Sequence, residues 1–181
     1  MTSDSSTSPS RAGIDPRSIA VLVGFLALSF VVAAGGSLAT IANVEGWYAE
    51  AEKAPWSPPN WVFGPVWTVL YALMAVAAWL VWREGSERRA AGGAVRRALA
   101  IYAGQLALNA IWTPIFFALY PTIGGAALWA ALAVIIALDV AVPLTILAFR
   151  PISRLAALLL VPYWLWVLFA TTLNWAVATL N

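Results

Sequence analysis

The stretch WYAEAEKAPWSPPNWVFGPVWTVLYALMAVAAWLVWR, residues 47–83, decides how the chain is organised. It begins as a charged loop rich in tryptophan and proline and continues into an apolar segment that carries more tryptophan. A simple connection between two helices does not need so many large aromatic side chains. We therefore interpret the loop 42–60 as a lid over a pocket for a flat apolar ligand, and the following segment as the first wall of that pocket.

The composition identifies a membrane protein. Of the 181 residues, 62% are hydrophobic and 10% are charged, and the mean hydropathy is +0.84. A water-soluble domain has roughly half of its residues apolar and about a quarter charged. A water-facing monomer of this length could not bury so much apolar surface, so we expect an integral membrane protein whose main partner is the lipid bilayer, and no nucleic acid.

The chain contains neither cysteine nor histidine. It therefore lacks disulfides, thiolate nucleophiles and sulfur ligands for metals. The absence of imidazole also excludes the common hydrolase triads, most metalloenzymes and haem held by histidine or cysteine. We expect no metal site and no obligatory cofactor.

Five apolar segments are each long enough to cross a hydrocarbon core of about 30 Å. Charged residues, glycine and proline separate them. The first segment is too long for the apolar part of a typical signal peptide, so we favour a transmembrane helix there. We predict an all-α bundle of five transmembrane helices, formed by a single domain (residues 18–181) that follows a disordered tail (residues 1–17). The helices are expected at about 18–41, 61–82, 98–119, 123–149 and 152–180.

The basic residues predict the orientation of the bundle. With five spans, nine of the ten lysines and arginines lie on one side, in the tail and in the second and fourth connections, and only Lys53 lies on the other. The positive-inside rule places the N-terminus inside, and the C-terminus and the loop 42–60 outside. Four or six spans would scatter the arginines, so the charge pattern also favours five.

The second predicted helix carries aromatic residues on one face. At 100° per residue, Phe63, Trp67 and Tyr71 point the same way. An interfacial aromatic belt is the alternative, and it accounts for Trp79 and Trp82 near the end of the segment. Trp67 and Tyr71 lie one to two turns inside, which favours a pocket wall.

The third predicted helix has two contrasting faces. Gln105, Asn109 and Trp112 share one of them. Amides inside a bilayer are costly unless they pair, so this face should turn towards the protein, either bridging helices or contacting a ligand. The opposite face has small residues at the spacing that permits close helix contact, and we predict a homodimer through Ala100, Ala103, Gly104 and Ala107.

The fourth predicted helix contains Asp139, the only acid inside a predicted span. Pro143, four residues later, cannot donate to the Asp139 carbonyl, so we expect a kink there. The carboxyl group is either a proton or substrate site or a buried acid paired with a neighbour. On the fifth predicted helix, Tyr163, Trp166 and Asn174 share a face with Ala170.

The chain resembles the TspO/translocator-protein family, also called tryptophan-rich sensory proteins, and looks like a bacterial-type member. The resemblance covers residues 20–180 and is carried by Trp47-Tyr48, KAPWSPPNW (53–61), GPVW (64–67), LYALM (70–74), GQLALNAIWTPIFF (104–117), SRLAA (153–157), VPYWLW (161–166) and FATTLN (169–174). It does not extend to the sterol-associated motif of animal members, because no lysine or arginine follows Arg154.

The resemblance implies a five-helix bundle, usually dimeric, in a prokaryotic cell membrane, that binds porphyrins and isoquinoline-type drugs. It places Trp47, Trp67, Asn109, Trp112, Trp166 and Ala170 in the pocket. Together with the residues that share their faces and the lid proline, the predicted ligand-binding set is Trp47, Pro55, Trp67, Tyr71, Asn109, Trp112, Tyr163, Trp166, Ala170 and Asn174. The ligand would be a porphyrin that is stacked on aromatic rings and not axially ligated.

Three functions agree with this interpretation. The first is a tetrapyrrole-binding protein that acts as sensor, scavenger or transporter. The second, implied by the resemblance, is light-dependent breakdown of porphyrin, with Trp67 and Trp166 as the candidate catalytic residues. The third is a proton-coupled transporter of small molecules that uses Asp139. We favour binding without ordinary enzymatic turnover, because the predicted pocket has no general acid, base or metal ligand.

Overall fold

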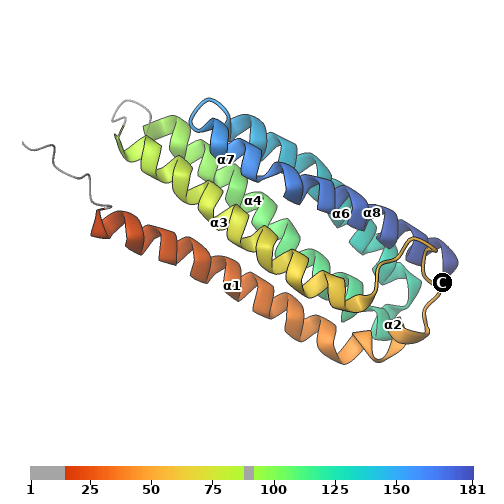
Figure 1. The fold of residues 1–181 in the computed structure, drawn as a ribbon. Coiled ribbons are helices and arrows are strands. Elements are labelled where there is room, and N and C mark those ends of the chain that lie inside the picture. Colours follow the sequence, from red (N-terminus) through yellow and green to blue (C-terminus); the bar gives the residue numbers. More distant parts are fainter. Residues whose placement is uncertain (1–14, 88–91) are drawn as a thin grey trace, which may run out of the picture.

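The computed structural model describes residues 15–87 and 92–181, and within them it shows long helices side by side and no strand (Figure 1). The long helices are α1 (Pro16–Val44), α3 (Phe63–Glu87), α4 (Gly92–Phe117), α6 (Gly125–Phe149) and the consecutive pair α7 (Arg154–Leu159) and α8 (Val161–Leu180). Three short elements, α2 (Trp47–Glu50), η1 (Asn60–Val62) and α5 (Tyr120–Ile123), lie in the connections. Five spans are long and apolar enough to cross a membrane, which confirms the predicted fold class.

Helices are the expected solution for this chain, because hydrocarbon offers no partner to backbone N–H and C=O groups and each span must pair its own. Polar side chains mark two of the helix starts. Asp15 accepts a hydrogen bond from the backbone N–H of Arg17 (3.2 Å), and Ser153 accepts one from that of Ala156 (3.4 Å). Residues 1–14 of the predicted tail lie outside the described residues, whereas Pro16 and Arg17 already belong to α1.

Two connections differ from the prediction. The helix α3 continues to Glu87, beyond residue 82, and α4 begins at Gly92, before residue 98. Alanine, arginine and glutamate favour helix, so both helices extend past their most apolar part. The two helices approach closely there, and a Cβ at Gly85 would lie 2.2 Å from a Val95 methyl group.

The last two spans are also divided differently from the prediction. The segment predicted to start at residue 123 is interrupted at Gly124, whose φ of +60° separates α5 from α6. The last span breaks at Leu160, because Pro162 has no N–H to continue the ladder. By contrast, α6 runs through Pro143 as one helix.

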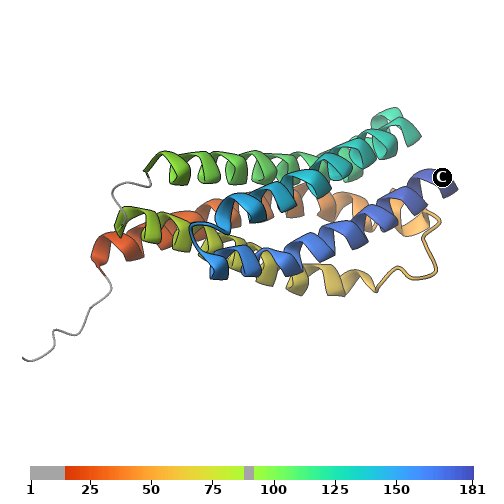
Figure 2. The same ribbon diagram turned by 90° about the horizontal axis from the view of Figure 1, so that it is seen from above.

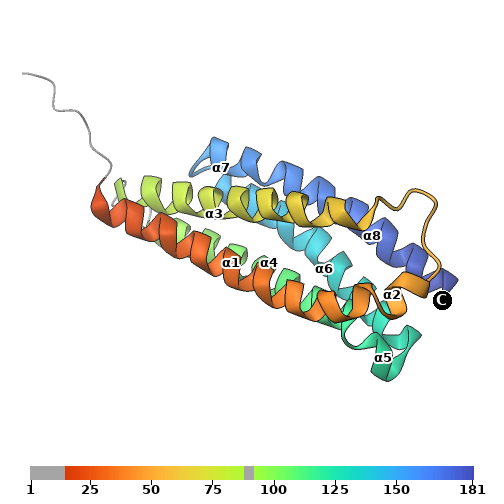
Figure 3. The ribbon, with the colours of Figure 1, turned by 60° about the horizontal axis from the view of Figure 1, so that its bottom comes forward.

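The core lies between α3, α4, α6, α7 and α8. Met74, Tyr102, Phe149 and Tyr163 are among its largest fully buried side chains. The helix α1 is peripheral: only 6% of its most apolar window is buried, against 28–39% for the other spans, and it packs mainly on α3 and α4. Figure 3 shows α1 along one side of the bundle. Most of its apolar surface is therefore left for lipid.

The bundle has two chemically different ends (Figures 1 and 2). The start of α1, the end of α3, the start of α4 and the α6–α7 connection meet at one end, which we call the arginine end. The loop between α2 and η1 and the C-terminus meet at the other, which we call the tryptophan end. Five spans were predicted to place most basic residues at one end of the bundle and the tryptophan-rich loop at the other, and the helices are arranged in this way. Which end faces the cytoplasm stays a prediction.

Candidate functional site

A cavity of about 930 Å³ lies in the half of the bundle nearer the tryptophan end, between α1, α3, α4 and α8. It exists because α3 packs closely on α7 but only slightly on α8, so these elements separate towards the tryptophan end. The volume is near the upper limit for small-molecule sites, which run from about 300 to 1,000 Å³. The cavity can therefore hold a ligand of considerable size.

Five of the predicted ligand-binding residues line this cavity: Trp67, Tyr71, Trp112, Ala170 and Asn174. The rings of Trp67 and Tyr71 are neighbours, with centroids 5.5 Å apart. They form an aromatic wall on α3, as the helical periodicity predicts. Ala170 leaves room opposite them because its side chain is small.

Two other predicted residues, Asn109 and Tyr163, form a layer behind this wall. The Tyr71 hydroxyl donates to Asn109 Oδ1 (2.7 Å), and Asn109 Nδ2 donates to the Tyr163 hydroxyl (3.2 Å). Both residues are buried and neither lines the cavity. Asn109 thus bridges α3, α4 and α8, and it fixes the orientation of the Tyr71 ring.

The side-chain amide of Asn174 holds the ring of Trp112 in place. Its indole Nε1 donates to Asn174 Oδ1 (3.0 Å), and Asn174 Nδ2 donates to the carbonyl of Leu128 (3.0 Å). This chain of bonds connects α4, α8 and α6. The Trp112 ring is therefore held in place before any ligand arrives.

Trp166 is predicted to line the pocket but lies one layer away. Its ring packs on Phe63 (centroids 5.8 Å apart) and Phe169 (5.5 Å), and Phe63 is the one that lines the cavity. The Trp166 indole N–H is buried and has no partner among the described residues. Trp166 therefore supports the wall from behind.

Trp47 also lies outside the cavity lining. Its ring stacks on Tyr120 (3.8 Å), and its Nε1 donates to the carbonyl of Phe117 (3.0 Å), so it fastens α2 to the α4–α5 corner. The next residue, Tyr48, lines the cavity in its place. Burial raises the pKa of the Tyr48 phenol, which therefore stays neutral at physiological pH.

The predicted lid is tied to α8. Trp56 Nε1 donates to the Thr172 hydroxyl (3.3 Å), and the Asn181 side chain accepts from the backbone N–H of Glu52 and donates to its carbonyl (both 3.0 Å). Pro55 is exposed. Residues 49–59 do not line the cavity; the loop 42–60 contributes to the lining only near its two ends, with Val44, Glu45 and Tyr48 at one end and Asn60 at the other.

The largest group of lining residues that the sequence reasoning missed comes from α1. That reasoning followed aromatic and amide residues, whereas α1 contributes mainly small ones. The signal was available, because the run Ala33–Ser37 (AAGGS) interrupts bulky apolar residues. The lining residues in that part of α1 are Ala33, Ala34, Gly36, Ser37 and Thr40.

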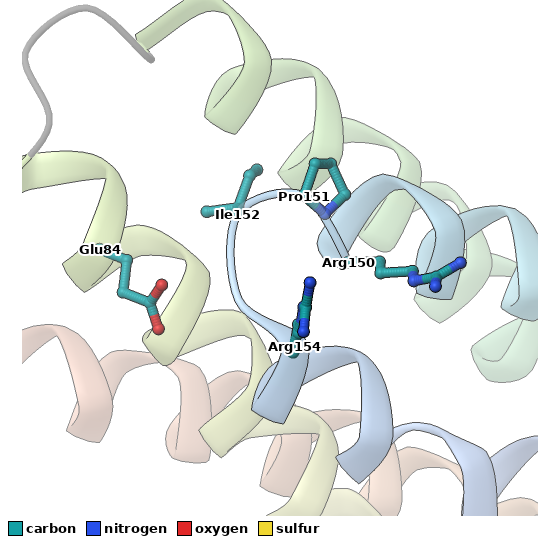
Figure 4. A pocket seen from close by; sticks show the side chains of 5 residues that line it. All are labelled: Glu84, Arg150, Pro151, Ile152 and Arg154. Atoms are coloured by element: carbon teal, nitrogen blue, oxygen red, sulfur yellow. The ribbon is translucent and has the colours of Figure 1, made fainter.

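A second cavity, of about 520 Å³, lies at the arginine end (Figure 4). Glu84 reaches it from α3, Arg150, Pro151 and Ile152 come from the α6–α7 connection, and Arg154 is the first residue of α7. Charged side chains dominate this lining, so it does not suit a flat apolar ligand. Among the described residues, no group of His, Cys, Asp or Glu could hold a metal ion.

Asp139 lies between α6 and α8, away from the cavity lining. Its Oδ2 is 2.8 Å from the Thr171 hydroxyl, while its Oδ1 is buried without a partner among the described residues. Its backbone carbonyl receives no hydrogen bond from Pro143, because proline has no N–H. It accepts one instead from Trp164 Nε1 (3.1 Å). The side chain of Trp164 thus replaces the missing helix hydrogen bond.

The sequence matches known proteins over nearly its whole length. The profile of the TspO/MBR family matches residues 25–180. A tryptophan-rich protein TspO of Archaeoglobus fulgidus is 40% identical over 163 residues, which cover 90% of this chain and 95% of the relative. The tryptophan-rich sensory protein of Cereibacter sphaeroides is 39% identical (86% and 91% covered), and the human translocator protein is 42% identical (72% of each).

Proposed function

The chain belongs to the TspO/MBR family, and on that premise we propose that it binds a porphyrin-type tetrapyrrole in the cavity between α1, α3, α4 and α8. It is an integral membrane protein, and its bacterial and archaeal relatives support a prokaryotic membrane as its location. The names of two relatives, the tryptophan-rich sensory protein of Cereibacter sphaeroides and the human translocator protein, support a role in sensing, scavenging or transport.

The observation that supports this proposal most strongly is the aromatic lining of a large, mainly apolar cavity. Trp67, Tyr71 and Trp112 contribute ring surfaces, and hydrogen bonds hold two of the three rings in place. Aromatic faces attract flat π-systems by stacking and by burial of apolar area. Since the chain has no histidine or cysteine, the macrocycle would be held by its faces and edges and not through an axial metal bond.

A binding titration in the dark tests this proposal. Protoporphyrin IX is added to the purified protein in detergent, and quenching of tryptophan fluorescence gives the Kd. The Trp67→Ala variant should bind about tenfold more weakly, because a buried aromatic contact contributes roughly 1–2 kcal/mol. Trp129, which is 51% exposed on α6, supplies the control: Trp129→Ala removes an indole from the outer surface and should leave the Kd unchanged. Equal Kd values for both variants and the wild type would exclude this cavity as the site.

Photo-oxidative degradation of porphyrin is the second candidate. It is favoured by the contact of Trp67 with Tyr71, because two oxidisable rings lie side by side in the cavity wall. Under light, an enzyme should convert many equivalents of porphyrin per protein, and Trp67→Phe should slow each turnover. Loss of porphyrin that stops near one equivalent would instead indicate damage to a bound ligand.

The third candidate, proton-coupled transport through Asp139, has less support because this residue does not line the cavity. It predicts that uptake into vesicles driven by a pH gradient disappears in Asp139→Asn. Unchanged uptake in that variant would remove this residue from any transport mechanism.

A further inference from the structure

Three buried polar side chains meet near the inner end of the cavity, the end that faces the middle of the bundle. Ser29 of α1 and Tyr102 of α4 are each 2% exposed, and Gln105 of α4 is 1% exposed. Ser29 Oγ, the Tyr102 hydroxyl oxygen and Gln105 Oε1 make no hydrogen bond of acceptable distance and angle among the described residues, although the Ser29 and Tyr102 hydroxyls are neighbours. The proposed function uses none of these atoms.

Helix geometry brings the three together. The Phe25 ring packs edge-on against Tyr102 (centroids 6.3 Å apart), which sets the level at which α1 crosses α4. Ser29 follows Phe25 by one turn of α1, and Gln105 follows Tyr102 by about one turn of α4. Both helices run from the arginine end towards the tryptophan end (Figure 3). We therefore infer that Ser29 and Gln105 lie at a similar level, one turn closer to the tryptophan end.

The cavity reaches this group through Ser29, because Tyr102 and Gln105 do not line it. Ser29 is one of its lining residues, together with Leu26 on the preceding turn of α1 and Tyr71 on α3. The Tyr71 hydroxyl donates its proton to Asn109, so it cannot also donate to Ser29 Oγ or Gln105 Oε1. Among the described residues, the Gln105 amide makes only one hydrogen bond, a weak one from Nε2 to the sulfur of Met74 at 4.0 Å.

The three atoms favour one kind of partner. The two hydroxyl groups can each donate a hydrogen bond, and the amide oxygen can accept one. A hydroxyl group of a ligand can accept from Ser29 or Tyr102 and donate to Gln105, so it satisfies both kinds of atom. A carboxylate could only accept, and its charge would be costly this deep in a bilayer.

We propose that the inner end of the cavity is a polar subsite that binds a neutral hydroxyl group on the buried edge of the ligand. This inference rests on the proposed function and specifies it further. A porphyrin would lie with its propionates towards the tryptophan end, where water is near, and with its opposite edge against Ser29, so that a hydroxyl group there reaches past the cavity wall to Tyr102 and Gln105. The preferred ligands are then flat apolar molecules with a hydroxyl group at the end opposite to their charges.

Two porphyrins that differ only at that edge provide the test. Protoporphyrin IX carries two vinyl groups where haematoporphyrin carries two 1-hydroxyethyl groups, and both have the same propionates. For each protein, the ratio of the two Kd values reports selectivity for the hydroxyl group. Ser29→Ala and Tyr102→Phe should weaken haematoporphyrin binding about tenfold and change protoporphyrin binding by less than about twofold.

Ser37→Ala is the matched control, because Ser37 lies on the same helix and lines the same cavity further from the subsite. It should leave the ratio unchanged. The unliganded Ser29→Ala and Tyr102→Phe proteins should unfold at the wild-type temperature or above it, because each loses a polar atom that has no partner. A lower unfolding temperature would show that Ser29 and Tyr102 already pair within the protein and would overturn the proposal.

The outcomes separate the two proposals. Equal weakening of both porphyrins, or an unchanged ratio, would contradict the subsite while leaving porphyrin binding intact. If the wild type binds neither porphyrin, the proposed function fails. The subsite is then tested by comparing the Kd values of 1-naphthol and 1-methylnaphthalene, two flat molecules of similar shape, of which only 1-naphthol has a hydroxyl group. Preference for 1-naphthol that disappears in Ser29→Ala supports the subsite, and no preference overturns it.

Discussion

Asn109 shows how a single residue couples the ligand wall to the stability of the bundle. Its amide accepts from Tyr71 and donates to Tyr163, so one side chain satisfies two buried phenols on different helices. Tyr71 faces the cavity, and Tyr163 is fully buried in the core. Any change at Asn109 should therefore affect both the stability of the fold and the position of the Tyr71 ring.

Replacing Asn109 by leucine tests this coupling. The side chains are similar in size, but leucine leaves both phenols without their partner. We expect the free energy of unfolding in detergent to fall by about 1–2 kcal/mol, the range for interhelical hydrogen bonds in membranes and for buried unpaired groups. Asn43→Leu is the control, because the Asn43 side chain bonds only to the Ala39 carbonyl of its own helix. If thermal or denaturant unfolding shows equal losses for both variants, the bridge contributes nothing beyond a local hydrogen bond.

Periodicity predicted some wall residues correctly and could not predict others. Trp67 and Tyr71 point into the cavity as their spacing on α3 indicates. Trp166 shares a face of α8 with Ala170, and Ala170 lines the cavity. Trp166 does not, because the Phe63 ring packs against it and lines the cavity instead. A helical repeat gives the direction of a side chain from its own axis. It does not say which side chain from another helix lies in front of it.

At the scale of elements, the helices were easier to predict than their ends. Long apolar runs specify helices, because the bilayer requires each span to satisfy its own backbone. The ends depend on local partners that sequence does not reveal, such as the close approach of Gly85 to Val95. Likewise, sequence did not reveal that Trp164 of α8 donates to the Asp139 carbonyl, to which Pro143 cannot donate; the kink expected at Pro143 stays a prediction.

The contact between Trp164 and the Asp139 carbonyl can be measured by a double-mutant cycle. Trp164→Phe should lower the free energy of unfolding by about 1 kcal/mol in the wild type, because the carbonyl then has no donor. In a Pro143→Ala background, residue 143 regains its N–H and can bond to Asp139 itself. The cost of Trp164→Phe should therefore be smaller there, and the difference is the interaction energy. An equal cost in both backgrounds would mean that Trp164 contributes only by packing.

At the scale of the whole molecule, hydropathy and charge together predicted five spans and two distinct ends. The position of the cavity could not be predicted in the same way. It depends on how α3 separates from α8 and on the small residues of α1, and both are properties of packing between distant segments. The loosely packed α1 combines two roles, because one face closes the cavity while most of its apolar surface is left for lipid.

The outer surface of α4 carries the residues through which the homodimer is predicted to form. The four residues Ala100, Ala103, Gly104 and Ala107 are all exposed in the single chain, so they are free to meet a second copy. Small residues let two helix backbones approach closely, which is the main source of helix association within lipid. A large side chain in the middle of this face should keep the helices apart.

Gly104→Leu tests the dimer without disturbing the fold, because a Cβ at this position would meet no atom within 4 Å. Gly24 of α1 is equally open, so Gly24→Leu is a matched control on another helix. We expect Gly104→Leu to raise the dimer dissociation constant at least about tenfold, and Gly24→Leu to leave it unchanged. Light scattering over a series of protein concentrations in detergent gives these constants. If all three proteins associate equally, the dimer does not form through this face. If both variants dissociate, the effect comes from bulk added to an apolar surface and not from α4 in particular.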